Sequence, residues 1–159
     1  MTTIDEPFIC MIRSTTKVSG TTNSFKTYFN FTNNTIDKYR EIKLKLKSVI
    51  IPHTISSGSS SETWAFADIK ISGFSFSNLY DSSSDNTTIG FITNNQYSIK
   101  GDYCFENMLS HELICDNPMS KLFTLSYTLY NGDFTTNSGT LNDSILIFEL
   151  KPYLFDGII

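Results

Sequence analysis

Residues 42–52 read IKLKLKSVIIP, and this segment decides the fold class of the chain. Apolar residues alternate with lysines from Ile42 to Lys47, a period of two that is typical of a strand with one face buried and the other in water. The alternation then gives way to the continuous apolar run 49–51, which predicts that the strand ends covered on both faces. Pro52 is expected to end the strand, because proline donates no ladder hydrogen bond.

The composition extends this interpretation to the whole chain. Its 159 residues fit one domain, which can bury roughly 70% of the surface that its unfolded form exposes. Apolar residues make up 40%, and 13 Phe, 8 Tyr and 1 Trp are typical of a globular rather than a disordered protein. Aromatic and β-branched residues separated by Thr, Ser and Asn favour strands and turns over helices. The sequence therefore predicts an all-β protein.

The charged residues bear on whether the chain binds nucleic acid, and the cysteines bear on the compartment in which it folds. The net charge is −4 and the only arginines are Arg13 and Arg40, whereas a nucleic-acid surface shows clustered Lys and Arg. We therefore expect no nucleic-acid partner. The cysteines Cys10, Cys104 and Cys115 are odd in number and lack a framework spacing, which favours reduced thiols in an intracellular compartment. We expect no signal peptide and no membrane span, because neither apolar pattern is present.

Further strands are predicted from alternation or from short apolar runs at residues 8–14, 25–31, 64–74, 88–93, 97–99, 121–130 and 144–151. Over 103–114, helical spacing competes with a strand near 103–106. About eight strands with loops of very different length favour a two-sheet jelly roll over an up-and-down barrel, which prefers short hairpins. We therefore expect a single eight-stranded jelly roll of two packed antiparallel sheets over residues 8–151. An N-terminal arm at 1–7 precedes it and an apolar tail at 152–159 follows it.

Loop chemistry marks the ends of several of these strands. The Ser-rich residues 53–62 are expected to form a flexible loop. Gly73 is expected to end the strand 64–74, and Pro152 to end the last strand. Residues 131–133, Asn-Gly-Asp, predict a turn in which Asn-Gly supplies the positive φ at low steric cost.

The residues that could act in catalysis or bind a metal do not form a recognisable catalytic or metal-binding motif in the sequence. Cupin-like metal centres in jelly rolls need several histidines and a carboxylate, but the chain has only His53 and His111. One local group, Cys104, His111, Glu112 and Cys115, has ligand chemistry but matches no zinc spacing. No serine lies in a Gly-x-Ser-x-Gly turn. We expect no enzyme, no catalytic, metal-binding or cofactor-binding residue, and no cofactor.

Two surface features allow a functional interpretation beside a structural one. The lysines at 43, 45 and 47 could form a patch for an acidic partner, but we favour a solvated strand face that discourages edge-to-edge aggregation. Trp64 could be a sugar-stacking platform, but a lone Trp at a strand start is more often a core or interface residue.

The order of several short motifs over residues 43–150 resembles that of a known protein family. The motifs are VIIP at 49–52, DIKISG at 68–73, GFI at 90–92, NP at 117–118, LFTLSYTL at 122–129, NGD at 131–133 and ILIFEL at 145–150. Together they resemble the single jelly-roll capsid proteins, penton-type or minor, of double-stranded DNA viruses such as nucleocytoplasmic large DNA viruses, virophages and polinton-like viruses. The structural residues of these motifs are Ile50, Ile51, Pro52, Ile69, Ile71, Gly73, Gly132 and Asp133.

The resemblance implies a structural capsid protein located in the virion and assembled inside the host cell. It implies a penton protein that forms homopentamers at the icosahedral vertices and contacts the double jelly-roll major capsid protein and other capsid proteins. Three alternatives remain open: another minor capsid protein, a trimeric spike or receptor-binding head, and a carbohydrate-binding jelly roll. For the last, Trp64 with the loop at residues 81–85 is the candidate site.

The end of the chain is rich in large apolar side chains, namely Tyr153, Leu154, Phe155, Ile158 and Ile159. A solvated tail of this composition would be prone to aggregation, so we expect it to be covered. It could fold back on its own subunit or reach a neighbour. We favour the neighbour, because the strands before it already supply a closed sandwich, and these residues are the candidate intersubunit contacts.

Overall fold

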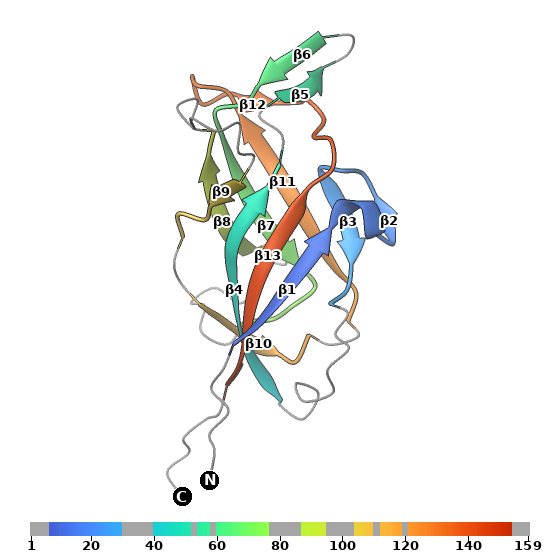
Figure 1. Cartoon of the computed structure of the whole chain (residues 1–159), viewed down its shortest axis with the longest axis vertical. Helices are drawn as coiled ribbons and strands as arrows, with labels where there is room; N and C mark the ends of the chain where they lie inside the picture. Colours follow the sequence, from blue (N-terminus) through green and yellow to red (C-terminus); the bar gives the residue numbers. More distant parts are fainter. Residues whose placement is uncertain are drawn as a thin grey trace, which may run out of the picture.

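A computed structural model of the chain describes residues 7–29, 40–51, 54–57, 60–76, 87–94, 104–109, 112–118 and 121–153. Two antiparallel sheets make up the fold (Figure 1). The five-stranded sheet contains β1 (Phe8–Arg13), β13 (Ile145–Tyr153), β4 (Glu41–Ile50), β10 (Leu113–Asp116) and β9 (Cys104–Glu106). The six-stranded sheet contains β2 (Ser19–Gly20), β3 (Ser24–Thr27), β11 (Phe123–Tyr130), β7 (Phe66–Ser72), β8 (Thr87–Thr93) and β12 (Thr136–Asn137). A separate ribbon pairs β5 (Thr54–Ser57) with β6 (Ser60–Thr63), and a 3₁₀ turn, η1, spans Ser14–Thr16.

The strand pairing is that of a long hairpin rolled into two layers. Both β9 and β10 pair with β4, so they count as one interrupted strand, and the main strands in chain order are β1, β3, β4, β7, β8, β9/β10, β11 and β13. The first strand pairs with the eighth, the second with the seventh, the third with the sixth and the fourth with the fifth. The eighth also pairs with the third, and the seventh with the fourth. This is a jelly roll, and the predicted all-β fold class is confirmed.

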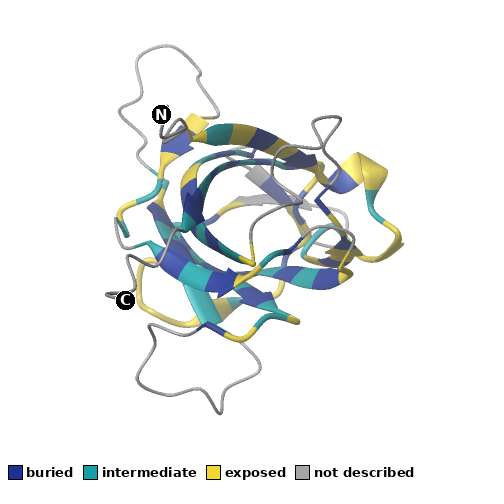
Figure 2. Cartoon of the chain, turned by 90° about the horizontal axis from the view of Figure 1, so that it is seen from below, coloured by how far each residue is buried: buried dark blue, intermediate teal, exposed yellow. Residues whose placement is uncertain are grey.

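The core lies between the two sheets, because the strands of both sheets turn alternate residues inward. In β11 the buried and half-buried residues alternate without interruption, and β4 shows the same pattern from Glu41 to Leu46. Figure 2, which looks along the sandwich from below, shows the buried residues recurring along the strands that enclose the interior. Phe29 joins the layers: its ring centroid lies 4.8 Å from that of Phe123 in one sheet and 5.4 Å from that of Phe148 in the other.

The prediction that residues 53–62 form a flexible loop is wrong where the structure describes them. The ribbon of β5 and β6 occupies most of this segment, and Ile55 is buried. Ser56 exchanges two backbone hydrogen bonds with Thr140, of 2.9 and 2.7 Å, and the side chain of Ile55 lies against Gly139, where an added Cβ would collide with it. One apolar side chain with a place in the core therefore outweighs the flexible composition around it.

The ambiguous stretch 103–114 forms strands where it is described, at β9 and at the start of β10. Helical spacing is overridden here because both segments complete the hydrogen-bond ladder along the free edge of β4. The strand expected at 97–99 lies outside the described residues.

The end of β4 differs from the expected cover on both faces. Val49 and Ile51 are buried, but Ile50 is only half-buried. The pairing of β13 with β4 shifts register between Ile147 and Phe148. The even-numbered residues of β4 therefore point inward up to Leu46, and the odd-numbered residues point inward from Val49 onward. The extra residue of the bulge is Lys47 of β4, because Phe148 pairs with Leu46 and Ile147 with Ser48. The bulge shows only in the pairing with β13, which the β4 sequence alone does not reveal.

Pro152 does not end the last strand, so the prediction that this strand stops at residue 151 is wrong. The strand β13 continues to Tyr153, and Pro152 is buried opposite Ile42 of β4. The ladder with β1 begins only at the Phe8–Leu150 pair. Pro152 therefore lies beyond β1, where its missing N–H removes no bond to that strand.

Candidate interaction surface

Three of the family-motif residues that the structure describes are core positions. Ile51, Ile69 and Ile71 are buried, with at most 1% of their surface exposed. Gly73 follows the last residue of β7 at φ 107°, so the prediction that it ends this strand is confirmed. Pro52 lies outside the described residues. The buried members of this set therefore contribute to the core.

The turn after β11 differs from the prediction in one respect. Gly132 and Asp133 are exposed in a turn as expected, but within the described chain the positive φ near this turn falls on Phe134, at 70°, and not on the Asn-Gly pair. The backbone N–H of Phe134 donates to Asn131 O (3.0 Å), and that of Asn131 donates to Thr135 O (2.8 Å). This five-residue loop places its left-handed residue late, so the short Asn-Gly turn does not form.

The local group with ligand chemistry, in which the sequence predicts no metal site, is not assembled among the described residues. Cys104 is exposed and Cys115 is buried, while His111 lies outside the description, as does His53. No set of three or more His, Cys, Asp or Glu side chains in the described ranges is placed to hold a metal ion. Burial raises the pKa of Cys10 to about 11, and burial with the charge of Asp116 raises that of Cys115 to about 12.

We expect the three thiols to differ in reactivity. The nucleophile is the thiolate, so in the native protein near pH 8 a maleimide should modify Cys104 rapidly and leave Cys10 and Cys115 unmodified. The raised pKa values mean that unfolding releases protons above pH 9, so the free energy of unfolding should fall as the pH rises from 9 towards 11. Peptide mapping of the labelled protein measures the first effect. Native labelling of Cys115 as fast as Cys104 would contradict the burial.

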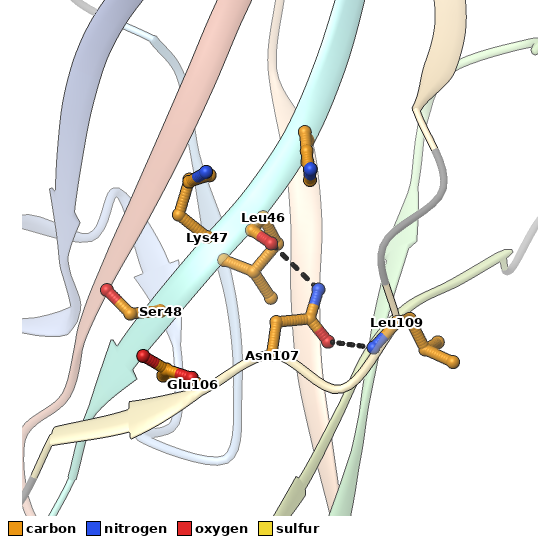
Figure 3. A pocket seen from close by; sticks show the side chains of 7 residues that line it. Leu46, Lys47, Ser48, Glu106, Asn107 and Leu109 are labelled. Atoms are coloured by element: carbon orange, nitrogen blue, oxygen red, sulfur yellow. Dashed lines mark hydrogen bonds between the residues drawn. The ribbon is translucent and has the colours of Figure 1, made fainter.

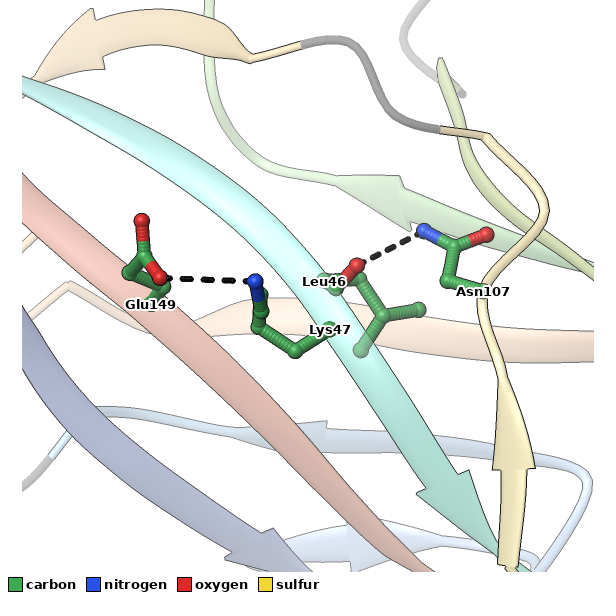
Figure 4. Close-up of polar contacts among 4 residues, drawn as sticks. All are labelled: Leu46, Lys47, Asn107 and Glu149. Carbon is green, nitrogen blue, oxygen red and sulfur yellow. Dashed lines mark hydrogen bonds and ion pairs between the residues drawn. The ribbon is translucent and has the colours of Figure 1, made fainter.

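The lysine row of β4 is engaged by acidic and aromatic side chains of the same chain. Lys47 Nζ lies 3.7 Å from Glu149 Oε2 (Figure 4), and Lys43 Nζ lies 3.6 Å from Glu112 Oε2. Lys43 also lies 5.5 Å from the ring centroid of Tyr153. Ion pairs this exposed contribute at most about 1 kcal/mol each. The contacts agree with a solvated strand face.

A hollow of about 350 Å³ opens where β9 leaves the edge of β4 (Figure 3). Asn107 lies in its wall and bridges the two sheets: its Nδ2 donates to Leu46 O (2.8 Å) and to Ile89 O (3.0 Å). Its Oδ1 accepts from the N–H groups of Phe91 (3.0 Å) and Leu109 (3.1 Å). The amide is fully used in closing the sandwich, so it is a structural bridge. Sequence reasoning missed it because a single asparagine in a loop carries no distinguishing pattern.

Trp64 is a core residue. It is 1% exposed and its ring meets that of Phe105 edge-on, with 5.2 Å between centroids. A buried ring cannot stack on a sugar, so this half of the proposed carbohydrate site is wrong. The loop 81–85, its other half, lies outside the described residues.

The outer face of β1 is the most apolar strand surface that the described residues expose. Ile9 is 60% exposed and Met11 50% exposed, and Arg13 continues the same outward row. The row extends across the sheet, because Met11 pairs with the half-buried Ile147 of β13. Within the described chain β1 pairs with β13 alone, so it is an edge strand. We call Ile9, Met11, Arg13 and Ile147 the β1 face.

Only the first of the candidate tail contacts can be placed. Tyr153 belongs to β13 and is half-buried opposite Glu41. Leu154, Phe155, Ile158 and Ile159 lie outside the described residues, as do residues 1–6 of the predicted arm.

Comparisons with known proteins add no relative. The chain matches no protein-family model, and no curated protein or solved structure matches it with significance. No helix in the described part of the chain is long and apolar enough to cross a membrane.

Proposed function

We propose that this chain is a structural capsid protein of a double-stranded DNA virus, a penton subunit that assembles as a homopentamer at the vertices of an icosahedral shell. The observation that carries the proposal is the β1 face on a jelly roll. Jelly rolls occur in viral capsids but also in lectins and cupins, so the fold by itself does not assign a function.

The β1 face is the second observation, beside the fold, that supports a capsid subunit. Monomeric proteins protect edge strands with charges, prolines or bulges, yet β1 presents Ile9 and Met11 to solvent on an edge. Burial of two such side chains is worth roughly 1.5–3 kcal/mol each. A subunit that is meant to be covered by a neighbour has this surface, and the order of sequence motifs given above supports the same family.

A carbohydrate-binding jelly roll is the less favoured alternative, because the ring of Trp64 is enclosed by the core. Binding of the isolated protein to a glycan array would favour it.

The oligomeric mass tests the proposal. Native mass spectrometry of the full chain should give a species of five subunits of 18.0 kDa each. The double variant Met11→Lys, Ile147→Lys should be monomeric, because a lysine on each strand places charge where apolar contact is required. The control is Ser75→Lys, which adds a lysine at an exposed position outside the strands and away from the β1 face.

The control should assemble as the unmodified chain does. A trimer would contradict the penton assignment and favour a spike, and a chain that stays monomeric whether or not the β1 face is modified would contradict the proposal as a whole.

A further inference from the structure

A second exposed apolar surface lies on the outer side of the six-stranded sheet. Phe66 of β7 stacks on Tyr130 of β11, with centroids 4.9 Å apart and planes inclined by 13°. The ring of Phe91 from β8 lies 5.5 Å from that of Phe66, and the ring of Phe134 lies 5.6 Å from it. We call these four residues the aromatic patch. Phe134 is 78% exposed, more than any other large apolar side chain in the described part of the chain.

Phe134 is held in this exposed position at a conformational cost. Its φ of 70° lies in the left-handed region, which a bulky side chain rarely adopts and where glycine would be unstrained. The loop around it is fixed by side chains: Thr135 donates from its N–H (3.1 Å) and its hydroxyl (2.6 Å) to Asp133 Oδ1, and Asn131 Nδ2 donates to Thr135 Oγ1 (3.0 Å). A strained backbone that presents an aromatic ring to solvent indicates a binding role for that ring.

Two carboxylates lie beside the aromatic patch, and Lys70 follows two residues after Asp68 on the same face of β7. Asp133 precedes Phe134 directly, and Asp68 accepts a hydrogen bond from the hydroxyl of Tyr130 at 3.2 Å. The partner that fits this surface therefore combines apolar side chains with a cation, since a guanidinium pairs with carboxylates and packs on aromatic faces.

The other exposed apolar side chains outside the β1 face lie beside lysines. They are Val18 next to Lys17, Tyr28 two residues after Lys26, Leu122 next to Lys121, and Met108 beside the hollow that Lys45 and Lys47 line. These positions suit a cationic partner less well than the aromatic patch, where two carboxylates accompany the single lysine Lys70.

The β1 face has the chemistry that the aromatic patch requires. It offers Ile9 and Met11, whose thioether makes favourable contacts with aromatic rings, and Arg13 at its end. The two surfaces lie on opposite sheets of the sandwich, as the two different patches of a head-to-tail contact do. We propose that the aromatic patch of one subunit binds the β1 face of a second copy of this chain, with Arg13 placed against Asp68 and Met11 against Phe134. This inference rests on the proposed function, because it names the second patch of the ring contact.

The first test separates strain from binding. Phe134→Gly removes the ring and relieves the left-handed backbone, so the midpoint of thermal unfolding should stay the same or rise, while self-association measured by sedimentation equilibrium should weaken at least tenfold. Leu122→Ala, an exposed apolar position beside a lysine, should change neither quantity. A stable Phe134→Gly variant that associates as strongly as the unmodified chain would overturn the inference.

The second test reverses the charges. Arg13→Asp and Asp68→Arg should each weaken association, and the double variant should recover it, because the exchanged charges attract again across the same contact. Failure of the double variant to recover would overturn the pairing of the two patches. The outcomes also separate the two proposals. If the unmodified chain does not assemble, the proposed function fails. If it assembles and none of these substitutions changes its association, only the present inference fails.

Discussion

Trp64→Ala is expected to lower the free energy of unfolding by about 3–5 kcal/mol, the cost of removing a large aromatic side chain from a packed core. The side chain is 1% exposed and touches Phe105 of the opposite sheet edge-on. Its removal leaves a cavity at a point where β9 already joins β4 by few ladder bonds. A domain with a stability of 5–15 kcal/mol would lose a large fraction of it.

Denaturant unfolding followed by far-ultraviolet circular dichroism measures this loss without relying on the fluorescence of Trp64, the only tryptophan. Tyr28→Ala is the matched control, because it removes an aromatic side chain that is 47% exposed and should change stability by about 0.5 kcal/mol or less. Equal effects of the two substitutions would show that Trp64 does not lie in the core.

Asn107→Asp should lower the free energy of unfolding by about 2–4 kcal/mol, although a carboxylate is nearly the same size as the amide that it replaces. The amide donates to two carbonyl oxygens, those of Leu46 in β4 and Ile89 in β8. A carboxylate has no proton to donate, so both carbonyls lose their partner and face a negative charge. The bridge between the sheets is then broken at the edge where β9 turns away.

The pH dependence of this effect distinguishes the lost donor from a packing change. Below the pKa of the introduced carboxyl the protonated acid donates one hydrogen bond again, so the difference in stability between variant and unmodified chain should shrink on acidification. Asn142→Asp, the same change at an exposed loop position, should leave stability within about 0.5 kcal/mol at either pH. A small cost for Asn107→Asp at neutral pH would show that the amide does not bridge the sheets.

Local sequence patterns were sufficient to predict which residues point inward wherever one face of a strand is buried and the other is not. The alternation in residues 42–46 and in β11 identified inward residues correctly, because the side-chain period of a strand is fixed by its backbone. Gly73 was found for a similar reason, since a positive φ at the end of β7 requires a residue without Cβ. Together with loop lengths, these patterns predicted the all-β jelly roll.

Other features depend on a partner that is distant in the sequence. Ile50 turned outward because of the bulge at Lys47 in the pairing of β4 with β13. Pro152 stayed in its strand because it lies beyond the Phe8–Leu150 pair, where the ladder with β1 starts. The positive φ moved to Phe134 because the whole loop, and not the Asn-Gly pair, sets the turn.

The candidate surfaces were largely hidden from sequence reasoning. The lysine row and the tail stood out by composition, but the aromatic patch joins residues from β7, β8, β11 and the following loop, which no local pattern connects. Sequence by itself determined which residues turn inward along each strand, since that depends on backbone geometry alone. Tertiary structure decided which outward residues become neighbours, because strand order and register bring together side chains that lie far apart along the chain.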